Sequence, residues 1–104
     1  MEKYKLITCI VEQGKAGGII KEILKLGISG VTSFRGVGTG VREKIGLKGR
    51  LIEPEKEIFM TVVPEEKTDE MFGKIIELAN LKETARGFVF VQDVEKAFGF
   101  YKRD

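Results

Sequence analysis

Residues 32–40 read TSFRGVGTG, and this stretch decides how the rest of the chain is interpreted. A β-rich run beginning at Thr32 ends here in Gly36, Gly38 and Gly40, at alternating positions. Such a backbone can leave the strand, accept positive φ values and expose its N–H groups to a ligand. A strand–helix–strand pattern precedes the glycines, and after a charged segment a second copy of the pattern follows them. The three glycines therefore lie between the two copies of the strand–helix–strand pattern.

The two halves contain the same elements in the same order. Apolar and β-branched residues predict strands over residues 4–12 and from Val31 to about Arg35, and apolar residues at helical spacing predict a helix between them that ends at Gly27. Gly14 and the Gly17–Gly18 pair separate the first strand from that helix. In the second half we expect a strand over residues 57–63 that Pro64 stops, then a helix, then a strand over residues 87–91. Acidic residues mark the start of the second helix and Asn80 marks its end. A C-terminal tail covers about residues 93–104.

This order predicts an α+β chain with a ferredoxin-like βαββαβ fold. Right-handed crossovers then give a four-stranded antiparallel sheet with two helices on one face. We expect a single domain over residues 1–104. The charged segment at about residues 41–54 is a long loop, and a loop of this length in a small domain is usually functional.

Both faces of the expected sheet are apolar. In the first strand Leu6 and Ile10 alternate with Ile7, Cys9 and Val11, and in the last strand Phe88 and Phe90 alternate with Val89 and Val91. In the third strand Ile58, Met60 and Val62 alternate with Phe59 and Val63. Two helices cover only one face of a sheet, so the other face would expose a large apolar patch. The pattern therefore predicts a homo-oligomer that buries the free faces.

Composition excludes several classes of function. The 104 residues carry a net charge of +2, contain one cysteine and no histidine, and have no long apolar run. Nucleic-acid binding, membrane insertion, a histidine-based catalytic site and a cysteine-cluster metal site are not expected, and the cytoplasm is the expected compartment. Cys9 stands among apolar residues and is interpreted as a buried hydrophobe rather than a nucleophile.

Two interpretations of the glycine stretch stay open at this point. In one it binds phosphate, with backbone N–H groups, the Thr39 hydroxyl and the cations Arg35, Arg42 and Lys56 close by. In the other it is a plain strand exit that leads into a solvated charged loop. The chain carries neither a phosphate-binding P-loop pattern nor a dinucleotide-binding pattern, and Glu65–Glu66 is a helix-start feature rather than an acid/base pair. We therefore expect no enzyme.

Several motifs in order resemble the PII signal-transduction proteins, and more closely their PII-like relatives with a short Gly-Thr-Gly turn. The resemblance covers nearly the whole chain. Its motifs are residues 27–32 (GISGVT), the glycine stretch, residues 62–64 (VVP) and residues 87–94 (GFVFVQDV).

The resemblance implies a compact homotrimer that binds an adenine nucleotide (ATP, ADP or AMP) or another small anion in clefts between subunits. It implies no covalently bound cofactor and no metal. A loop at residues 41–54, the T-loop, would engage a regulated protein such as a membrane transporter or a metabolic enzyme. The implied nucleotide-binding residues are Thr32, Gly38, Thr39, Gly40, Lys56, Val62, Gly87 and Phe88, and the implied partner-binding residues are Arg42, Lys44, Lys48 and Arg50.

The chain also departs from the family pattern. Phe88, Gly99 and Tyr101 stand where PII proteins carry a lysine and two arginines, and Lys102 and Arg103 are out of register. Each missing charge-assisted hydrogen bond is worth about 1.5–3 kcal/mol. The pattern therefore favours ADP, AMP or another small anion over tight ATP binding. The alternative is a CutA-like structural or metal-stress trimer, against which the absence of histidine weighs. A small nucleotidase-like enzyme is a third interpretation, with no visible base.

Overall fold

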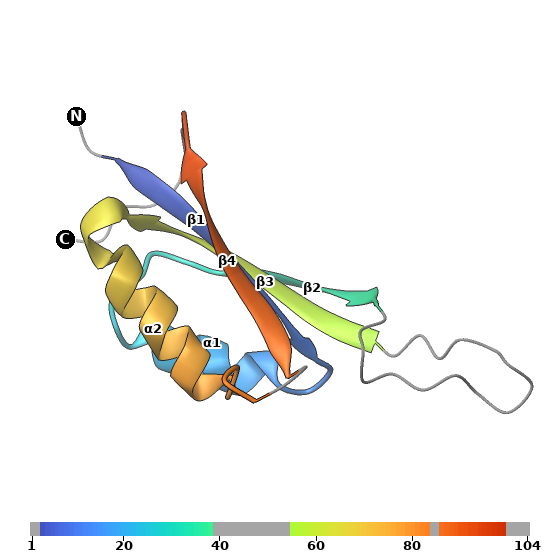
Figure 1. The fold of residues 1–104 in the computed structure, drawn as a ribbon. Coiled ribbons are helices and arrows are strands. Elements are labelled where there is room, and N and C mark those ends of the chain that lie inside the picture. The colour runs from blue at the N-terminus through green and yellow to red at the C-terminus, as the bar shows by residue number, and fades with distance from the viewer. Residues whose placement is uncertain (1–2, 39–54, 84–85, 100–104) are drawn as a thin grey trace, which may run out of the picture.

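The computed structural model describes residues 3–38, 55–83 and 86–99. The expected order of elements is confirmed (Figure 1). The strands pair antiparallel in the order β2-β3-β1-β4, which confirms the four-stranded antiparallel sheet. The elements are β1 (Tyr4–Glu12), α1 (Ala16–Leu24), β2 (Thr32–Val37), β3 (Glu55–Pro64), the 3-10 turn η1 (Glu65–Lys67), α2 (Thr68–Leu78) and β4 (Gly87–Val94).

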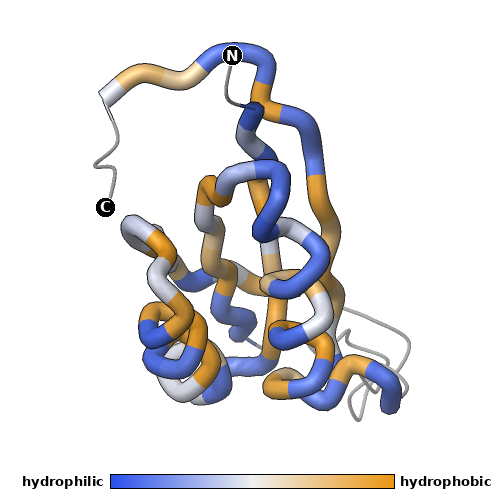
Figure 2. The backbone as a smooth tube through the Cα atoms, turned by 90° about the vertical axis from the view of Figure 1, so that its left-hand side faces the viewer, coloured by the Kyte–Doolittle hydropathy of each residue, from blue (hydrophilic) through white to orange (hydrophobic). Residues whose placement is uncertain are grey.

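The core lies between the two helices and one face of the sheet. Both helices lie on the same side of the strands (Figure 1). Hydrophobic residues recur along the strands and the helices (Figure 2), and the buried ones of β1 and β3 form the core with those of the helices. Cys9 has no exposed surface, which confirms its interpretation as a core residue. None of the helices in the described ranges is long and apolar enough to cross a membrane. The fully buried core side chains are Ile7, Cys9, Ile23, Phe59, Val63, Met71 and Ile75.

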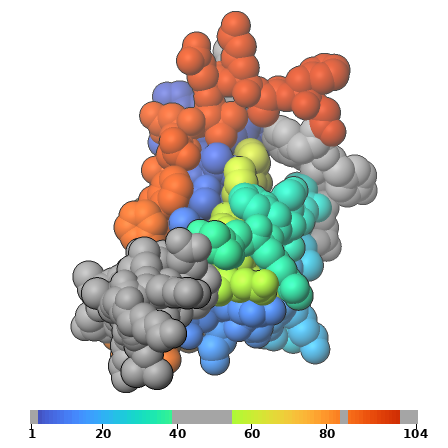
Figure 3. All heavy atoms as spheres, turned by 90° about the vertical axis from the view of Figure 1, so that its right-hand side faces the viewer, coloured from blue at the N-terminus to red at the C-terminus, as the bar shows by residue number. Residues whose placement is uncertain are grey.

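The second face of the sheet carries no helix, and Figure 3 looks onto it, with β4, β1, β3 and β2 side by side. The strand register confirms the alternation expected from the sequence, because it aligns apolar side chains in rows across this face. Phe34 and Phe88 are 50% and 60% exposed at the two ends of one row, so the single chain does expose the apolar patch that the sequence predicts. We call this surface the open face. Two of its rows are Phe34–Ile58–Ile10–Phe88 and Thr32–Met60–Thr8–Phe90.

Several boundaries differ from the expectation, among them those of β3, which runs from Glu55 to Pro64 rather than over residues 57–63 and so includes Pro64. Gly17 and Gly18 lie inside α1 rather than before it, and β2 extends to Val37 because Gly36 and Val37 still pair with β3. The expected tail at about 93–104 begins two residues later, because β4 continues to Val94. In each case hydrogen bonding to a neighbouring element outweighs the local signal of glycine or of mixed polarity. The expected loop over residues 41–54 lies outside the described residues.

The start of α1 is stabilised from the sheet. The residue before the helix, Lys15, makes no side-chain cap. Instead Oε1 of Glu57, in β3, accepts hydrogen bonds from the backbone N–H groups of Gly14 (2.8 Å) and Ala16 (2.9 Å). A carboxylate at this position satisfies N–H groups that have no partner within the helix and complements the helix dipole. This contact attaches α1 to the end of β3 that follows residues 39–54.

Candidate functional site

Thr32 and Val62 line a shallow cavity of about 460 Å³ at one end of the open face. Its side chains are mainly apolar, with Leu6 and Met60 beneath and hydroxyl groups from Ser29 and Thr32. The Thr61 hydroxyl donates to the Gly30 carbonyl (2.7 Å), which holds the segment before β2 against β3. Such a cavity suits a flat, largely apolar group that presents hydrogen-bonding atoms at its edge.

Gly38 and Lys56 lie together at the opposite end of β2 and β3. A Cβ at Gly38 would lie 3.5 Å from the Lys56 Cγ, and one at Gly36 would lie 3.3 Å from the Ile58 Cδ1. Neither glycine has a positive φ, so the two described glycines do not use the positive φ values that glycine can accept. The contact at Gly36 is tight, so limited space beside Ile58 favours glycine there, whereas the distance at Gly38 is an ordinary van der Waals contact. With no side chain, Gly38 would leave room for a ligand beside Lys56.

Gly87 and Phe88 lie at the start of β4, on the other edge of the sheet. A Cβ at Gly87 would come within 2.6 Å of the Ile10 carbonyl oxygen, so packing alone requires glycine at this position. Phe88 points to the open face, where its ring lies 5.4 Å from that of Phe90. The described part of β4 thus presents aromatic surface next to the glycine.

Within one chain the expected nucleotide residues do not form one cleft. Two strands lie between β2, which Gly38 follows, and β4, which contains Phe88, and this corresponds to about 14 Å across the sheet. Gly36 lies four positions after Thr32 along β2, or about 13 Å away. Gly99, one of the positions at which the sequence differs from the family pattern, follows β4 with a φ of +98°. Other expected residues lie outside the described ranges: Thr39, Gly40, Arg42, Lys44, Lys48, Arg50 and Tyr101.

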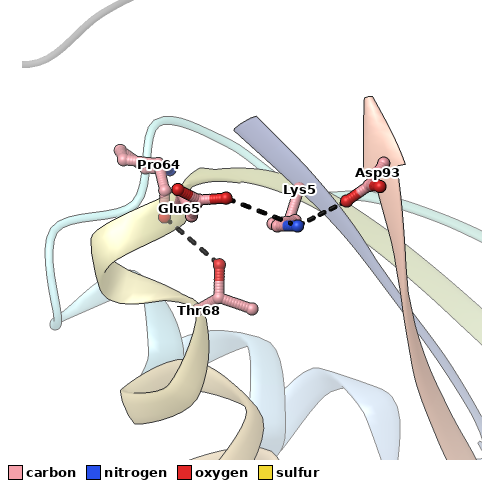
Figure 4. A network of polar contacts seen from close by, with 5 residues as sticks. All are labelled: Lys5, Pro64, Glu65, Thr68 and Asp93. Atoms are coloured by element: carbon pink, nitrogen blue, oxygen red, sulfur yellow. Dashed lines mark hydrogen bonds and ion pairs between the residues drawn. The ribbon is translucent and has the colours of Figure 1, made fainter. Parts of the chain in front are cut away.

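A cluster of charges that sequence reasoning missed joins three elements (Figure 4). Lys5 of β1 forms an ion pair and a hydrogen bond with Asp93 of β4, and its Nζ lies 3.5 Å from Oε2 of Glu65. The hydrogen bond to Asp93 raises the pKa of Lys5, and the same bond lowers the pKa of Asp93. The sequence contains a sign of this cluster, because the alternation of side chains along β1 puts Lys5 on the same face of the sheet as Ile7 and Cys9. A lysine at the margin of the helix-covered face needs a carboxylate partner.

The cluster holds the ends of two strands and the start of α2 together. The Thr68 hydroxyl donates to the Pro64 carbonyl (3.3 Å), and the Glu65 N–H donates to the Lys3 carbonyl (2.9 Å). An open cavity of about 1230 Å³ adjoins the cluster and continues along the segment from Glu95 to Phe98. Both charges of the Lys5–Asp93 pair are in contact with solvent, so the pair orients the strand ends more than it stabilises them.

Two further observations concern chemistry. Burial raises the pKa of the Cys9 thiol to about 12, so the thiol stays protonated and unreactive at neutral pH. Within residues 3–38, 55–83 and 86–99 there is no group of three or more acidic, histidine or cysteine side chains that could hold a metal ion.

Comparison with known families gives one match. Residues 4–102 match the family model described as Nitrogen regulatory protein P-II. The matched part includes all four strands and both helices. No individual curated protein matches the chain.

Proposed function

Because the chain belongs to the P-II nitrogen regulatory protein family, we propose that it is a cytoplasmic homotrimer that binds an adenine nucleotide or a similar small anion between subunits. Through residues 41–54 it would regulate a partner protein, such as a membrane transporter or a metabolic enzyme. P-II family proteins are regulatory proteins, and the specific assembly, effector and partner are the proposal. The observation that carries it is the open face.

The open face supports self-association. The row Phe34–Ile58–Ile10–Phe88 is apolar across all four strands, and its end residues are at least half exposed. Burying apolar surface contributes about 25 cal/mol per Å², so leaving this face in water is costly. Packing the open faces of three copies around an axis would remove it from solvent without a foreign partner.

The separation of the site residues supports a ligand site between copies. The cavity at Thr32 and Val62 and the corner at Gly38 and Lys56 belong to the β2 edge, whereas Gly87 and Phe88 belong to the β4 edge. In a ring of identical subunits, one edge of each copy comes close to a different edge of its neighbour. The Thr32 cavity would then hold the base, and the Lys56 ammonium would approach the phosphate groups.

Calorimetric titration of the purified protein with ATP, ADP and AMP tests the effector. Gly38→Val should weaken nucleotide binding by at least about tenfold, because a branched side chain would fill the space beside Lys56 that the proposed phosphate groups need. Gly73→Val is the matched control, since Gly73 has open space around its Cβ position and glycine and valine are both weak helix formers. The effector proposal fails if none of the three nucleotides binds, or if both variants bind alike.

Phe88→Lys tests the preference among nucleotides. A lysine after Gly87 would add one charge-assisted hydrogen bond, worth about 1.5–3 kcal/mol, to the outer phosphates. We expect the affinity for ATP to rise by about tenfold or more relative to AMP. Phe98→Lys adds the same charge at a fully exposed site and should leave the ratio unchanged. An unchanged ratio in Phe88→Lys would mean that Phe88 lies away from the phosphates.

A further inference from the structure

A separate cavity of about 210 Å³ lies on the helix side of the sheet, where α1 begins and α2 ends. Figure 1 places these two helix ends and the start of β4 at the same end of the molecule. The cavity combines an apolar floor with cations of two elements and one carboxylate. Its lining residues are Val11, Glu12, Lys15, Ile19, Leu78, Ala79, Asn80 and Arg86.

The turn between β1 and α1 forms one side of the cavity. The Lys15 N–H donates to the Glu12 carbonyl (3.2 Å), so Glu12 and Lys15 are held on the same turn. Glu57 fixes this turn through Gly14 and Ala16 and occupies the N–H groups at the start of α1. A ligand in the cavity would therefore meet the side chains of Glu12 and Lys15 and not a free helix N-terminus.

The end of α2 and the following turn form the other side. Asn80 has a φ of +57°, its N–H donates to the Glu77 carbonyl, and the Leu81 N–H donates to the Ile76 carbonyl. This is the hydrogen-bond pattern of a Schellman helix end. The Glu83 N–H then donates to the Asn80 carbonyl (3.2 Å), and the chain returns to the cavity at Arg86.

Arg86 is held in a way that leaves its outer face available. Its Nε donates to Oε2 of Glu83 at 2.7 Å, and within the described residues neither Nη group makes a hydrogen bond. Two Nη groups side by side match the geometry of a carboxylate. Lys15 supplies a second cation at the same cavity.

The charges disfavour a simple ion of either sign. Glu12 and the carbonyl end of α2, whose dipole is negative, oppose a plain anion. Lys15 and Arg86 oppose a plain cation. A molecule with a carboxylate and an ammonium on adjacent atoms satisfies both groups, and the partly exposed Leu78 offers apolar surface to an aliphatic body, with the buried Val11 and Ile19 behind it. The cavity has the volume of about seven water molecules, which limits the ligand to a small one.

We propose that this cavity binds a free α-amino acid with an aliphatic side chain. Arg86 and Lys15 would hold its carboxylate, Glu12 would hold its ammonium, and Leu78 would contact its side chain. The cavity adjoins the proposed nucleotide cleft at Gly87, which follows Arg86, but unlike that cleft it is lined by one chain and needs no second copy.

Three probes with the same aliphatic body test the charge pattern: L-leucine, 4-methylpentanoate, which lacks the ammonium, and 3-methylbutylamine, which lacks the carboxylate. In methyl NMR spectra of the full-length protein, L-leucine should shift the signals of Val11, Ile19 and Leu78. Each single-charge probe should bind at least about tenfold more weakly. The proposal is overturned if L-leucine leaves these methyl signals in place, or if either single-charge probe binds as tightly.

Matched variants test the residues. Arg86→Gln should abolish the shifts caused by L-leucine, whereas Lys82→Gln, which removes an exposed cation of the same turn outside the cavity, should retain them. Gly38→Val should also retain them, which separates this site from nucleotide binding. If Arg86→Gln and Lys82→Gln reduced the shifts caused by L-leucine equally, the assignment would be overturned, because the shifts would then depend on the overall charge of the protein and not on the cavity.

Discussion

At the scale of single residues, Gly87 and Gly73 differ in what an added methyl group would meet. A Cβ at Gly87 would overlap the Ile10 carbonyl oxygen at 2.6 Å and press on Leu81 and Val11, whereas nothing lies within 4 Å of the corresponding position at Gly73. We expect Gly87→Ala to lower the free energy of unfolding by about 1–3 kcal/mol. Gly73→Ala should raise it by up to about 1 kcal/mol, because alanine favours the helix.

Urea unfolding of the two variants beside the parent chain measures both changes. Equal stability of Gly87→Ala and the parent would show that β4 shifts away from β1 without cost. The comparison also matters for the site, since it separates a packing requirement at Gly87 from a role in holding phosphate.

Cys9 makes a pH-dependent contribution to stability. Its pKa is raised to about 12 in the folded chain, from an ordinary value of 9.0. Between these values the unfolded chain loses the thiol proton and the folded chain keeps it, so stability falls as pH rises from 9 towards 12. Urea unfolding at pH 8 and pH 10 should show a larger loss for the parent than for Cys9→Ala. Equal losses in the two proteins would contradict the assignment.

At the scale of elements, the start of α1 depends on a residue of β3. Glu57→Ala leaves the N–H groups of Gly14 and Ala16 without their acceptor and should lower the free energy of unfolding by about 0.5–2 kcal/mol. Glu55→Ala is the matched control, because Glu55 lies two residues earlier on the same face of β3 and is exposed. Urea unfolding gives the energies, and amide hydrogen exchange at Ala16 should accelerate only in Glu57→Ala.

The elements also show where local sequence patterns mislead. Gly17 and Gly18 are typical of a break, yet they lie in the first part of α1, whose N–H groups find an acceptor 40 or so residues away in the chain. Gly36 and Val37 continue β2 because β3 supplies hydrogen-bond partners for them. Neither partner is visible in the local sequence, so element order was predictable and element ends were not.

At the scale of the whole molecule, the proposed trimer depends on the open face. Ile10 lies on the central strand β1, in the row between Phe34 and Phe88. Ile10→Lys should lower the mass measured by light scattering towards the 11.6 kDa of one chain, because a buried unpaired charge costs several kcal/mol per copy. Leu24→Lys makes the same kind of change on an exposed position of α1 and should leave the mass unchanged.

A single mass near one chain for the unmodified protein would contradict the trimer directly. If the assemblies of both single variants, Leu24→Lys and Ile10→Lys, dissociated, the association surface would instead include the helices. The two variants thus separate the open face from the rest of the surface.

The sequence by itself determined the order of elements, the antiparallel sheet with helices on one side, and the division of each strand into two faces. Hydrophobic periodicity carries this information, since alternate residues of a strand must point to opposite faces. Lys5 on the helix-covered face was readable in the same way, although its partners Asp93 and Glu65 were not.

Only the tertiary structure decided which distant groups meet. Glu57 reaches α1, Gly87 packs on Ile10, and Glu12, Lys15 and Arg86 converge on one cavity, because strand register and turn geometry bring residues far apart in the chain together. It also separated Thr32, Gly38 and Gly87, which the sequence suggests as one site, onto opposite edges of the sheet. Pairing between strands is a long-range interaction, so no local pattern specifies these distances.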